Sequence, residues 1–393
     1  MLLKISWPAR DFLVISLFLC AGLAACRQDH SSGSEEESAY MADYESSVGK
    51  WGFMNKEGKV TIKPVFDDVG LFSEGLAAVN HKGLWGFINL KGKQIIKPVF
   101  RSAWAFHEKR ARVLPFDHPA IFIDQHGKAM VAEDWSAEDD FSEGRARVKV
   151  GDAFGFIDST GKIVIQPVYT RGWNFRNGVC VVEYHEKLGL IDLKGSYILN
   201  PEFDFIKIAG QQNIILCHKS DEAIAYDTEG KELANLPGCK MVDSDGHLIS
   251  VRDKAGMYFF NLSKQTSIKP ISYINIIYLG DYLWAGKTKE GYWLLDDQGH
   301  IVSSIAYNQI NKFSDGLAAF SKGDFWGYID GKGTERISDV FGLAWDYKEG
   351  YARVAFKDGI GFIDTQQKLA FYPPEGSIDL RDYAEGMAAV HFQ

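Results

Sequence analysis

Histidine and carboxylate groups are the side chains of this chain that could hold a metal or move a proton. The densest acidic run extends from Glu133 to Asp140 and could supply oxygen ligands to calcium. Asp117-His118 lies near His126, a combination that could bind zinc or act as a base. His126 stands at a turn position, however, and a solvated loop explains the acidic run equally well. We therefore expect no metal ion.

The sequence contains none of the common catalytic or nucleotide-binding motifs. It has no GxSxG, HExxH, P-loop or CxxC sequence, and no GxGxxG that follows a strand-like run. No pair of carboxylates stands out as the acid and nucleophile of a glycosidase. The sequence therefore predicts no catalytic residue and no cofactor, and it favours a binding protein over an enzyme.

The tryptophans fall into two groups. Trp51, Trp85 and Trp326 each precede glycine in a repeated pair, and side chains fixed by a repeat usually serve packing. Five other tryptophans show no fixed place in the repeat, which makes them better candidates for an exposed binding face. The candidate ligand-binding residues are Trp104, Trp135, Trp173 and Trp345, each just before a predicted third strand, whereas Trp284 lies within a third-strand run.

About ten copies of one pattern of roughly 34 residues must position these side chains. Each copy is phased by an Asn or Asp, and glycine follows three residues later in eight copies. The Asx side chain accepts hydrogen bonds from backbone N–H groups, and glycine in the left-handed conformation closes the hairpin as a G1 bulge. The phasing residues are Asn55, Asn89, Asp124, Asp158, Asp192, Asp227, Asn261, Asp296, Asp330 and Asp364.

Further positions of the repeat are fixed relative to this turn. Proline recurs in the second strand, as at Pro64 and Pro98, and must end that strand or lie where it is unpaired. An aromatic residue such as Phe72 then introduces an FSEG sequence and a third apolar run. Copies five to eight, at about 188–325, have lost much of this pattern.

The runs are too short for helices and are bounded by glycine and proline, so we expect an all-β protein. A unit of this size cannot bury its apolar face alone, and neighbouring units must stack. We favour an open or curved β-solenoid of β-meander repeats over a closed propeller-like ring, because ten small blades would make an unusually large ring. In the ring, the last strand, at 387–392, would pair with the first strand at Trp51.

These repeats resemble the WG-repeat family of bacterial proteins, also described as KWG repeats. The matching residues are Lys50-Trp51-Gly52-Phe53, Trp85-Gly86-Phe87-Ile88-Asn89 and Trp326-Gly327-Tyr328-Ile329-Asp330. The resemblance covers about residues 50–393 and implies a repeat architecture without common catalytic residues. It assigns no functional residue to this chain.

The first 25 residues read as an export signal, with Lys4 and Arg10 before a short apolar core. Leu23-Ala24-Ala25-Cys26 resembles the lipobox of bacterial lipoproteins, which implies that Cys26 becomes the lipidated N-terminus. Residues 26–50 then form a polar, acidic, flexible tether, and the repeat domain occupies 51–393. We expect an exported, membrane-anchored lipoprotein of the outer membrane, on its periplasmic face or at the cell surface.

Cysteine usage and charge exclude further classes of function. Three cysteines remain outside the signal and Cys26, namely Cys180, Cys217 and Cys239. An odd number does not make a disulfide framework, although a single Cys180–Cys217 bridge is possible. The net charge of −9 argues against nucleic acid as a partner. We therefore expect a non-enzymatic envelope scaffold that binds an unknown protein or glycan; the alternative is a propeller-type hydrolase with an axial active site.

Overall fold

The computed structural model describes residues 49–130, 135–210, 213–357, 359–366, 368–371 and 374–392. Every helix or strand assigned within these ranges is a β-strand, and none of the described residues forms a helix able to cross a membrane. The residues from Val48 onward make one compact unit. The export signal, Cys26 and nearly all of the predicted tether lie outside the described residues.

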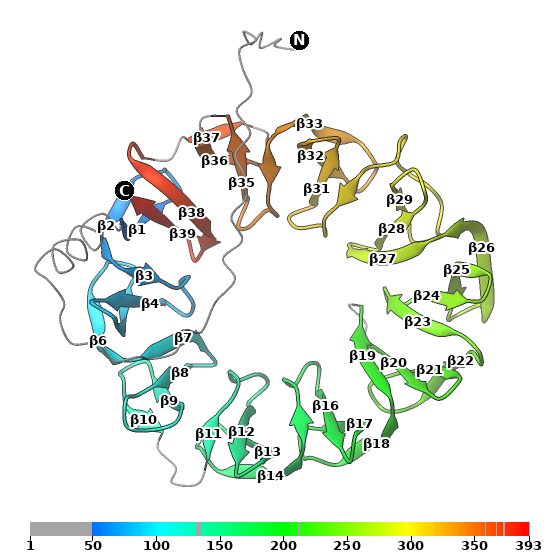
Figure 1. The fold of residues 1–393 in the computed structure, drawn as a ribbon, viewed down its shortest axis with the longest axis horizontal. Helices are drawn as coiled ribbons and strands as arrows, with labels where there is room; N and C mark the ends of the chain where they lie inside the picture. Colours follow the sequence, from blue (N-terminus) through cyan, green and yellow to red (C-terminus); the bar gives the residue numbers. More distant parts are fainter. Residues whose placement is uncertain are drawn as a thin grey trace, which may run out of the picture. The chain divides into compact units, whose positions relative to one another are not determined.

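The described strands form ten antiparallel sheets, nine of four strands and one of three, arranged as blades around a ring (Figure 1). From the innermost to the outermost strand, the first five blades are blade 1 (β38 Ser377–Ala384, β39 Met387–Phe392, β1 Lys50–Asn55, β2 Val60–Phe66), blade 2 (β3 Asp68–Val69, β4 Leu76–His81, β5 Leu84–Asn89, β6 Gln94–Phe100), blade 3 (β7 Ser102–His107, β8 Arg110–Leu114, β9 Ile121–Asp124, β10 Ala129–Met130), blade 4 (β11 Ser136–Ala137, β12 Ala146–Val150, β13 Ala153–Ile157, β14 Ile163–Tyr169) and blade 5 (β15 Arg171–Gly172, β16 Val179–Tyr184, β17 Lys187–Asp192, β18 Tyr197–Phe203).

The other five blades follow in chain order. They are blade 6 (β19 Phe205–Ala209, β20 Ile214–Lys219, β21 Glu222–Tyr226, β22 Glu232–Asn235), blade 7 (β23 Lys240–Ser244, β24 Leu248–Asp253, β25 Gly256–Asn261, β26 Thr266–Tyr273), blade 8 (β27 Asn275–Gly280, β28 Leu283–Lys287, β29 Tyr292–Leu295), blade 9 (β30 Gln309–Ile310, β31 Leu317–Lys322, β32 Phe325–Asp330, β33 Glu335–Phe341) and blade 10 (β34 Leu343–Ala344, β35 Tyr351–Phe356, β36 Gly359–Asp364, β37 Leu369–Phe371).

The two ends of the repeat array meet in blade 1. Strand β1 pairs with β39 over six residues, from Lys50 opposite Phe392 to Asn55 opposite Met387. The expectation of an open or curved solenoid is therefore wrong, and the alternative, a closed propeller ring, is confirmed. Closure is favoured physically because it pairs the strand edges that an open array would expose at both ends.

Each of the nine four-stranded blades contains one strand more than the sequence indicates. The loop before the third apolar run holds the innermost strand, which in five blades is only two residues long, as in β3. A strand of two residues has no detectable alternation of apolar and polar side chains, so no sequence pattern predicts it.

The Asx–Gly turns form as predicted. Asn55 Oδ1 accepts hydrogen bonds from the backbone N–H groups of Glu57 at 3.2 Å and Lys59 at 3.0 Å, and Gly58 adopts a φ of 75°. The same bonds recur at the other phasing residues with glycine, as when Asp330 Oδ1 accepts from the N–H groups of Lys332 and Thr334. These turns join the two outer strands of each blade.

The glycine of the Trp-Gly pair is required by the outer strand. A Cβ on Gly52 would lie 2.5 Å from the carbonyl oxygen of Ile62, because β2 bulges toward β1 between Ile62 and Phe66. Pro64 lies in this outermost strand, which has no neighbour beyond it, as the sequence predicts. Trp51 is buried, while Trp85 and Trp326 are half-buried, so these tryptophans serve mainly packing.

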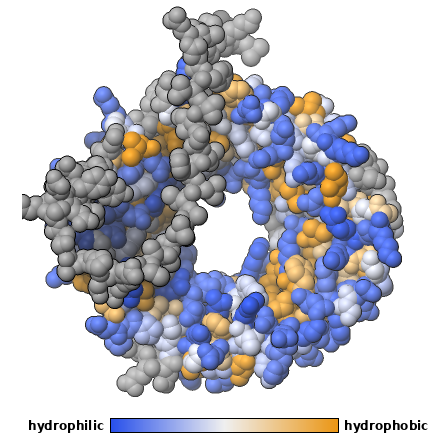
Figure 2. Space-filling model, viewed as in Figure 1, coloured by the Kyte–Doolittle hydropathy of each residue, from blue (hydrophilic) through white to orange (hydrophobic). Residues whose placement is uncertain are grey.

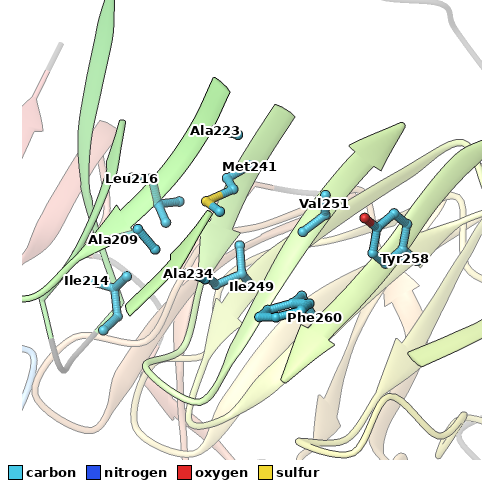
Figure 3. Close-up of a cluster of buried hydrophobic side chains, with 11 residues drawn as sticks. Ala209, Ile214, Leu216, Ala223, Ala234, Met241, Ile249, Val251, Tyr258 and Phe260 are labelled. Atoms are coloured by element: carbon cyan, nitrogen blue, oxygen red, sulfur yellow. The ribbon is translucent and has the colours of Figure 1, made fainter. Parts of the chain in front are cut away.

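The hydrophobic core lies between blades rather than in one central mass. Figure 3 shows one such cluster, in which side chains of blade 6 meet those of blade 7. Trp284 belongs to a comparable cluster between blades 7 and 8, where it is fully buried and its Nε1 donates to Asp245 at 3.0 Å. The labelled residues of Figure 3 are Ala209, Ile214, Leu216, Ala223 and Ala234 from blade 6, and Met241, Ile249, Val251, Tyr258 and Phe260 from blade 7.

Candidate functional site

The innermost strands line a central channel, which the space-filling view shows to be open (Figure 2). In every blade, two consecutive half-buried or exposed residues precede a more deeply placed residue, which in most blades packs into a core, such as Phe72 or Phe106. We call these residues the wall pairs. They are Gly70-Leu71, Trp104-Ala105, Asp139-Asp140, Trp173-Asn174, Lys207-Ile208, Val242-Asp243, Ile277-Tyr278, Asn311-Lys312, Trp345-Asp346 and Arg381-Asp382.

Three of the four candidate tryptophans occupy the same place in this wall. Trp104, Trp173 and Trp345 are each the first residue of a wall pair, so the expectation that they have no fixed place in the repeat is wrong. Trp173 is 45% exposed. Trp135 is only 5% exposed and packs in the core of blade 4, so the expectation that it contributes to an exposed face is also wrong.

Two of these tryptophans are stacked against arginine. The guanidinium carbon of Arg112 lies 4.2 Å from the ring centre of Trp104, and that of Arg353 lies 4.7 Å from the ring centre of Trp345. A cation over an aromatic face contributes about 0.5–2 kcal/mol, so the arginines hold the indoles in place. Sequence reasoning missed both arginines. Their signal is the RxR or YxR sequence at the start of the third apolar run, where the other copies have alanine, valine, leucine or serine.

Each of these arginines also reaches the next blade. Arg112 Nη1 donates to the carbonyl oxygen of Glu138 at 2.8 Å, and Arg353 donates to the carbonyl oxygen of Leu380 and to Asp382. Such arginines satisfy carbonyl groups of inner strands, which would otherwise lack a partner at the channel. The wall is thus tied from blade to blade by charged side chains.

Blade 4 carries the most unusual charge environment in the channel. Asp139 replaces the tryptophan and pairs with Arg147 at 3.4 Å, while Asp140 lies 3.6 Å from Arg112 and 3.7 Å from His107. Burial raises the pKa of Asp140 even though these two basic groups favour its ionised form. The same arginine-to-aspartate contact joins blades 10 and 1, so we assign Asp140 to the joints of the ring.

A second set of joints runs through the FSEG turns. Their carboxylates accept hydrogen bonds from backbone N–H groups of the following blade. Glu349, for example, accepts from Glu385 at 2.6 Å and from Gly386 at 2.9 Å. Burial opposes ionisation of Glu349, but these bonds and one from Lys56 outweigh it and lower its pKa. The further donor–acceptor pairs are Gly75–Glu385, Lys109–Glu74, Gly144–Glu108, Asn177–Glu143, Gly178–Glu143 and Gly350–Asp315.

The remaining candidates are the histidines, the cysteines and the acidic run, of which Glu133 and Asp134 lie outside the described residues. No group of three or more histidine, cysteine or acidic side chains in the described ranges could hold a metal ion. His126 is exposed in an Asx–Gly turn, where its N–H donates to Asp124 Oδ1 at 2.9 Å. Cys180 and Cys217 are buried free thiols, whose pKa burial raises to about 12, so no Cys180–Cys217 bridge is present.

Comparison with known proteins finds a repeat family that part of the chain resembles and gives no guide to function. No curated protein matches the chain. Solved structures with a similar fold include a eukaryotic initiation factor (9% identity, 83% of this chain and 96% of that chain, TM-score 0.46). BamB from Moraxella catarrhalis (11%, 74% and 96%, TM-score 0.35) and Hsv2p from Kluyveromyces lactis (13%, 60% and 94%, TM-score 0.32) are further examples. Similarity at this level carries no information on ligands.

The family model for the WG-containing repeat matches five segments of the chain. They are residues 51–85, 85–114, 154–187, 294–324 and 326–359. Each segment runs from the outer strands of one blade to the inner strands of the next, and 294–324 begins in β29 of blade 8. Over these segments, which make up less than half of the chain, the sequence is similar to the WG-containing repeat.

Proposed function

We propose that this protein is a non-catalytic binding propeller of the bacterial cell envelope, which holds a protein or glycan ligand against the wall of its channel. The observation that carries the proposal is the repeated use of one wall position for Trp104, Trp173 and Trp345. Trp173 is 45% exposed, and Trp104 and Trp345 are half-buried. Large, partly exposed aromatic side chains are typical anchors of binding surfaces.

The surroundings of the three rings also suit a ligand. Two indoles are held by arginine on one side, so little side-chain entropy would be lost when a ligand packs against them. Asn174 and Asp346 directly follow two of the tryptophans and offer hydrogen-bonding groups beside an apolar surface. This combination of stacking and polar groups fits sugar rings and peptide groups alike.

The envelope location rests on the N-terminal sequence, Leu23-Ala24-Ala25-Cys26. Lipid on Cys26 would anchor the ring to a membrane through a tether. Substitution Cys26→Ser tests this part. We expect the variant to appear in the soluble fraction, and continued sedimentation with membranes would reject the anchor.

The binding function is tested with the full chain in detergent. We would screen immobilised glycans and displayed peptides for ligands, then compare the Trp104→Ala/Trp173→Ala/Trp345→Ala variant with the control Phe116→Ala. Phe116 is 60% exposed but belongs to no wall pair. We expect at least tenfold weaker binding for the wall variant alone, because each lost aromatic anchor costs about 1 kcal/mol or more. Unchanged binding by the wall variant would reject the proposal.

A further inference from the structure

The inner edges of several blades are closed by side chains. In blade 2, the N–H of Val69 donates to Asp68 Oδ1 at 2.8 Å, and the carbonyl oxygen of Val69 accepts from Arg381. In blade 1, Leu380 is capped in the same way by Asp379 and Arg353. Such caps prevent another strand from pairing with the edge.

Strand β19 of blade 6 has a different inner edge. All five of its residues, from Phe205 to Ala209, pair with β20 in unbroken register. The four other inner strands longer than two residues, β7, β23, β27 and β38, each contain a register shift before their last pair. The other five inner strands have two residues each. Blade 6 thus presents the longest regular inner edge of the described ring.

The direction of the backbone groups follows from the register. Asp204 N–H donates to the carbonyl oxygen of His218, so His218 and the alternate residues of β20 face β19. Their partners are Phe205, Lys207 and Ala209, which therefore face β20. The N–H and C=O groups of Ile206 and Ile208 consequently point away from the sheet, toward the channel. No hydrogen bond within the described ranges caps them.

The wall around this edge is apolar and has no net charge. Lys207 Nζ is paired with Asp243 Oδ1 at 3.0 Å, which neutralises the only charged wall residues of blades 6 to 8. The rest of their wall pairs are Ile208, Val242, Ile277 and Tyr278. Figure 2 shows hydrophobic residues gathered on the wall where β19, β23 and β27 lie. Trp173, in blade 5, is the aromatic wall residue next to blade 6 around the ring.

We propose that β19 receives an extended, uncharged polypeptide segment as an added β-strand inside the channel. The inference rests on the proposed binding function and names the class of ligand. The N–H and C=O groups of Ile206 and Ile208 supply main-chain hydrogen bonds to the added strand. Its side chains alternate between the wall pair of blade 5, with Trp173, and that of blade 7, with Val242. The occupant is a polypeptide because Ile206 and Ile208, two residues apart, each direct one N–H and one C=O group toward the channel. This spacing matches the two-residue repeat of hydrogen-bonding groups along another β-strand.

The test uses one position with two substitutions. Ile208→Ala shortens the side chain but keeps the N–H that faces the channel. Ile208→Pro removes that N–H as well. It preserves the hydrogen bonds between β19 and β20, because the N–H of residue 208 donates none of them. The probe is a peptide selected from a display library of short random sequences on the full chain in detergent. We expect Ile208→Pro to bind this peptide about tenfold more weakly than Ile208→Ala does.

Each outcome decides the question. Equal binding by the two variants would overturn strand addition, and so would the absence of any selected peptide that binds more tightly than about 1 mM. If Ile208→Pro loses its circular dichroism spectrum, the wild-type protein is tested with the peptide N-methylated on one face. Undiminished binding of that peptide also rejects the proposal. If Trp173→Ala weakens binding but neither Ile208→Pro nor N-methylation of the peptide does, the added strand is rejected and the proposed binding at the channel wall is retained.

Discussion

Substitution Gly86→Ala is the sharpest test of the blade geometry. The added methyl group would lie 2.6 Å from the carbonyl oxygen of Ile96, 2.7 Å from the nitrogen of Pro98 and 2.8 Å from the carbonyl carbon of Lys97. All three atoms belong to the backbone of β6. Rotation of a side chain therefore cannot relieve the contact, and the outer strand itself must move.

The required movement sets the size of the effect. Ordinary van der Waals contact begins at 3.4 Å, so β6 must retreat by 3.4 − 2.6, or about 0.8 Å, at its closest point. This strains the pairing of Phe87 with Ile96 and of Trp85 with Phe100. Overpacking of this kind costs about 1–3 kcal/mol, whereas alanine regains about 0.5–1 kcal/mol of backbone entropy. We expect a net loss of about 1–2 kcal/mol.

The equivalent glycine of blade 10 provides a matched control. A Cβ on Gly361 would meet only side-chain atoms, Phe356 Cε2 at 3.0 Å and Leu369 Cδ1 at 3.5 Å, both of which can rotate aside. The same substitution there should change the free energy of unfolding by less than about 0.5 kcal/mol.

Urea unfolding, followed by circular dichroism, compares the two variants with the wild-type protein. We expect the midpoint of Gly86→Ala to fall and that of Gly361→Ala to stay near the wild-type value. If both variants unfold at the same urea concentration, the close approach of the outer strand is not the reason for glycine in the Trp-Gly pair.

Three further predictions concern the joints and the cysteines. Glu349→Gln should lower stability by about 1 kcal/mol at pH 7. Because the folded-state pKa of Glu349 is lowered, its contribution exists above the unfolded pKa and is lost as pH falls through the folded pKa, so wild type and variant should melt together once Glu349 is protonated in both states. Arg353→Met should destabilise the ring by about 2–4 kcal/mol in urea, since it leaves Asp382 half-buried without its partner, and a smaller loss would mean that water replaces the pair. Iodoacetamide at pH 8 should label partly buried Cys239 in the native protein, whereas Cys180 and Cys217, with pKa values near 12, should react only after unfolding, as peptide mass spectrometry would show.

Local chemistry was predictable from the sequence, and long-range pairing was not. The Asx–Gly hairpins need only a few adjacent residues, so Asn55 and Gly58 predict their own turn. Closure depends on β1 meeting β39, at the other end of the chain, and the curvature that brings them together is set by packing between blades. The resemblance to the WG-repeat family indicated repeats but did not choose between a solenoid and a ring.

The candidate site was predicted only in part for a related reason. Trp104, Trp173 and Trp345 were found by residue type, but their common position became visible only once the inner strand was known. Trp135 has the same residue type and lies close in sequence to an inner strand, yet it faces the core of blade 4. Residue type therefore identifies candidate tryptophans, and the side of the strand on which each side chain lies decides which of them reach the channel.

Two kinds of contact join neighbouring blades in different parts of the ring. Carboxylate-to-backbone bonds run without a break from Asp315 in blade 9, through the seam at blade 1, to Glu143 in blade 4. The seam between the chain ends is thus joined like the regular interfaces. In blades 7 and 8 the buried Trp284–Asp245 hydrogen bond and an apolar cluster connect the units. The FSEG sequence is absent from these two blades and from blade 6, where the inner strand β19 pairs in unbroken register.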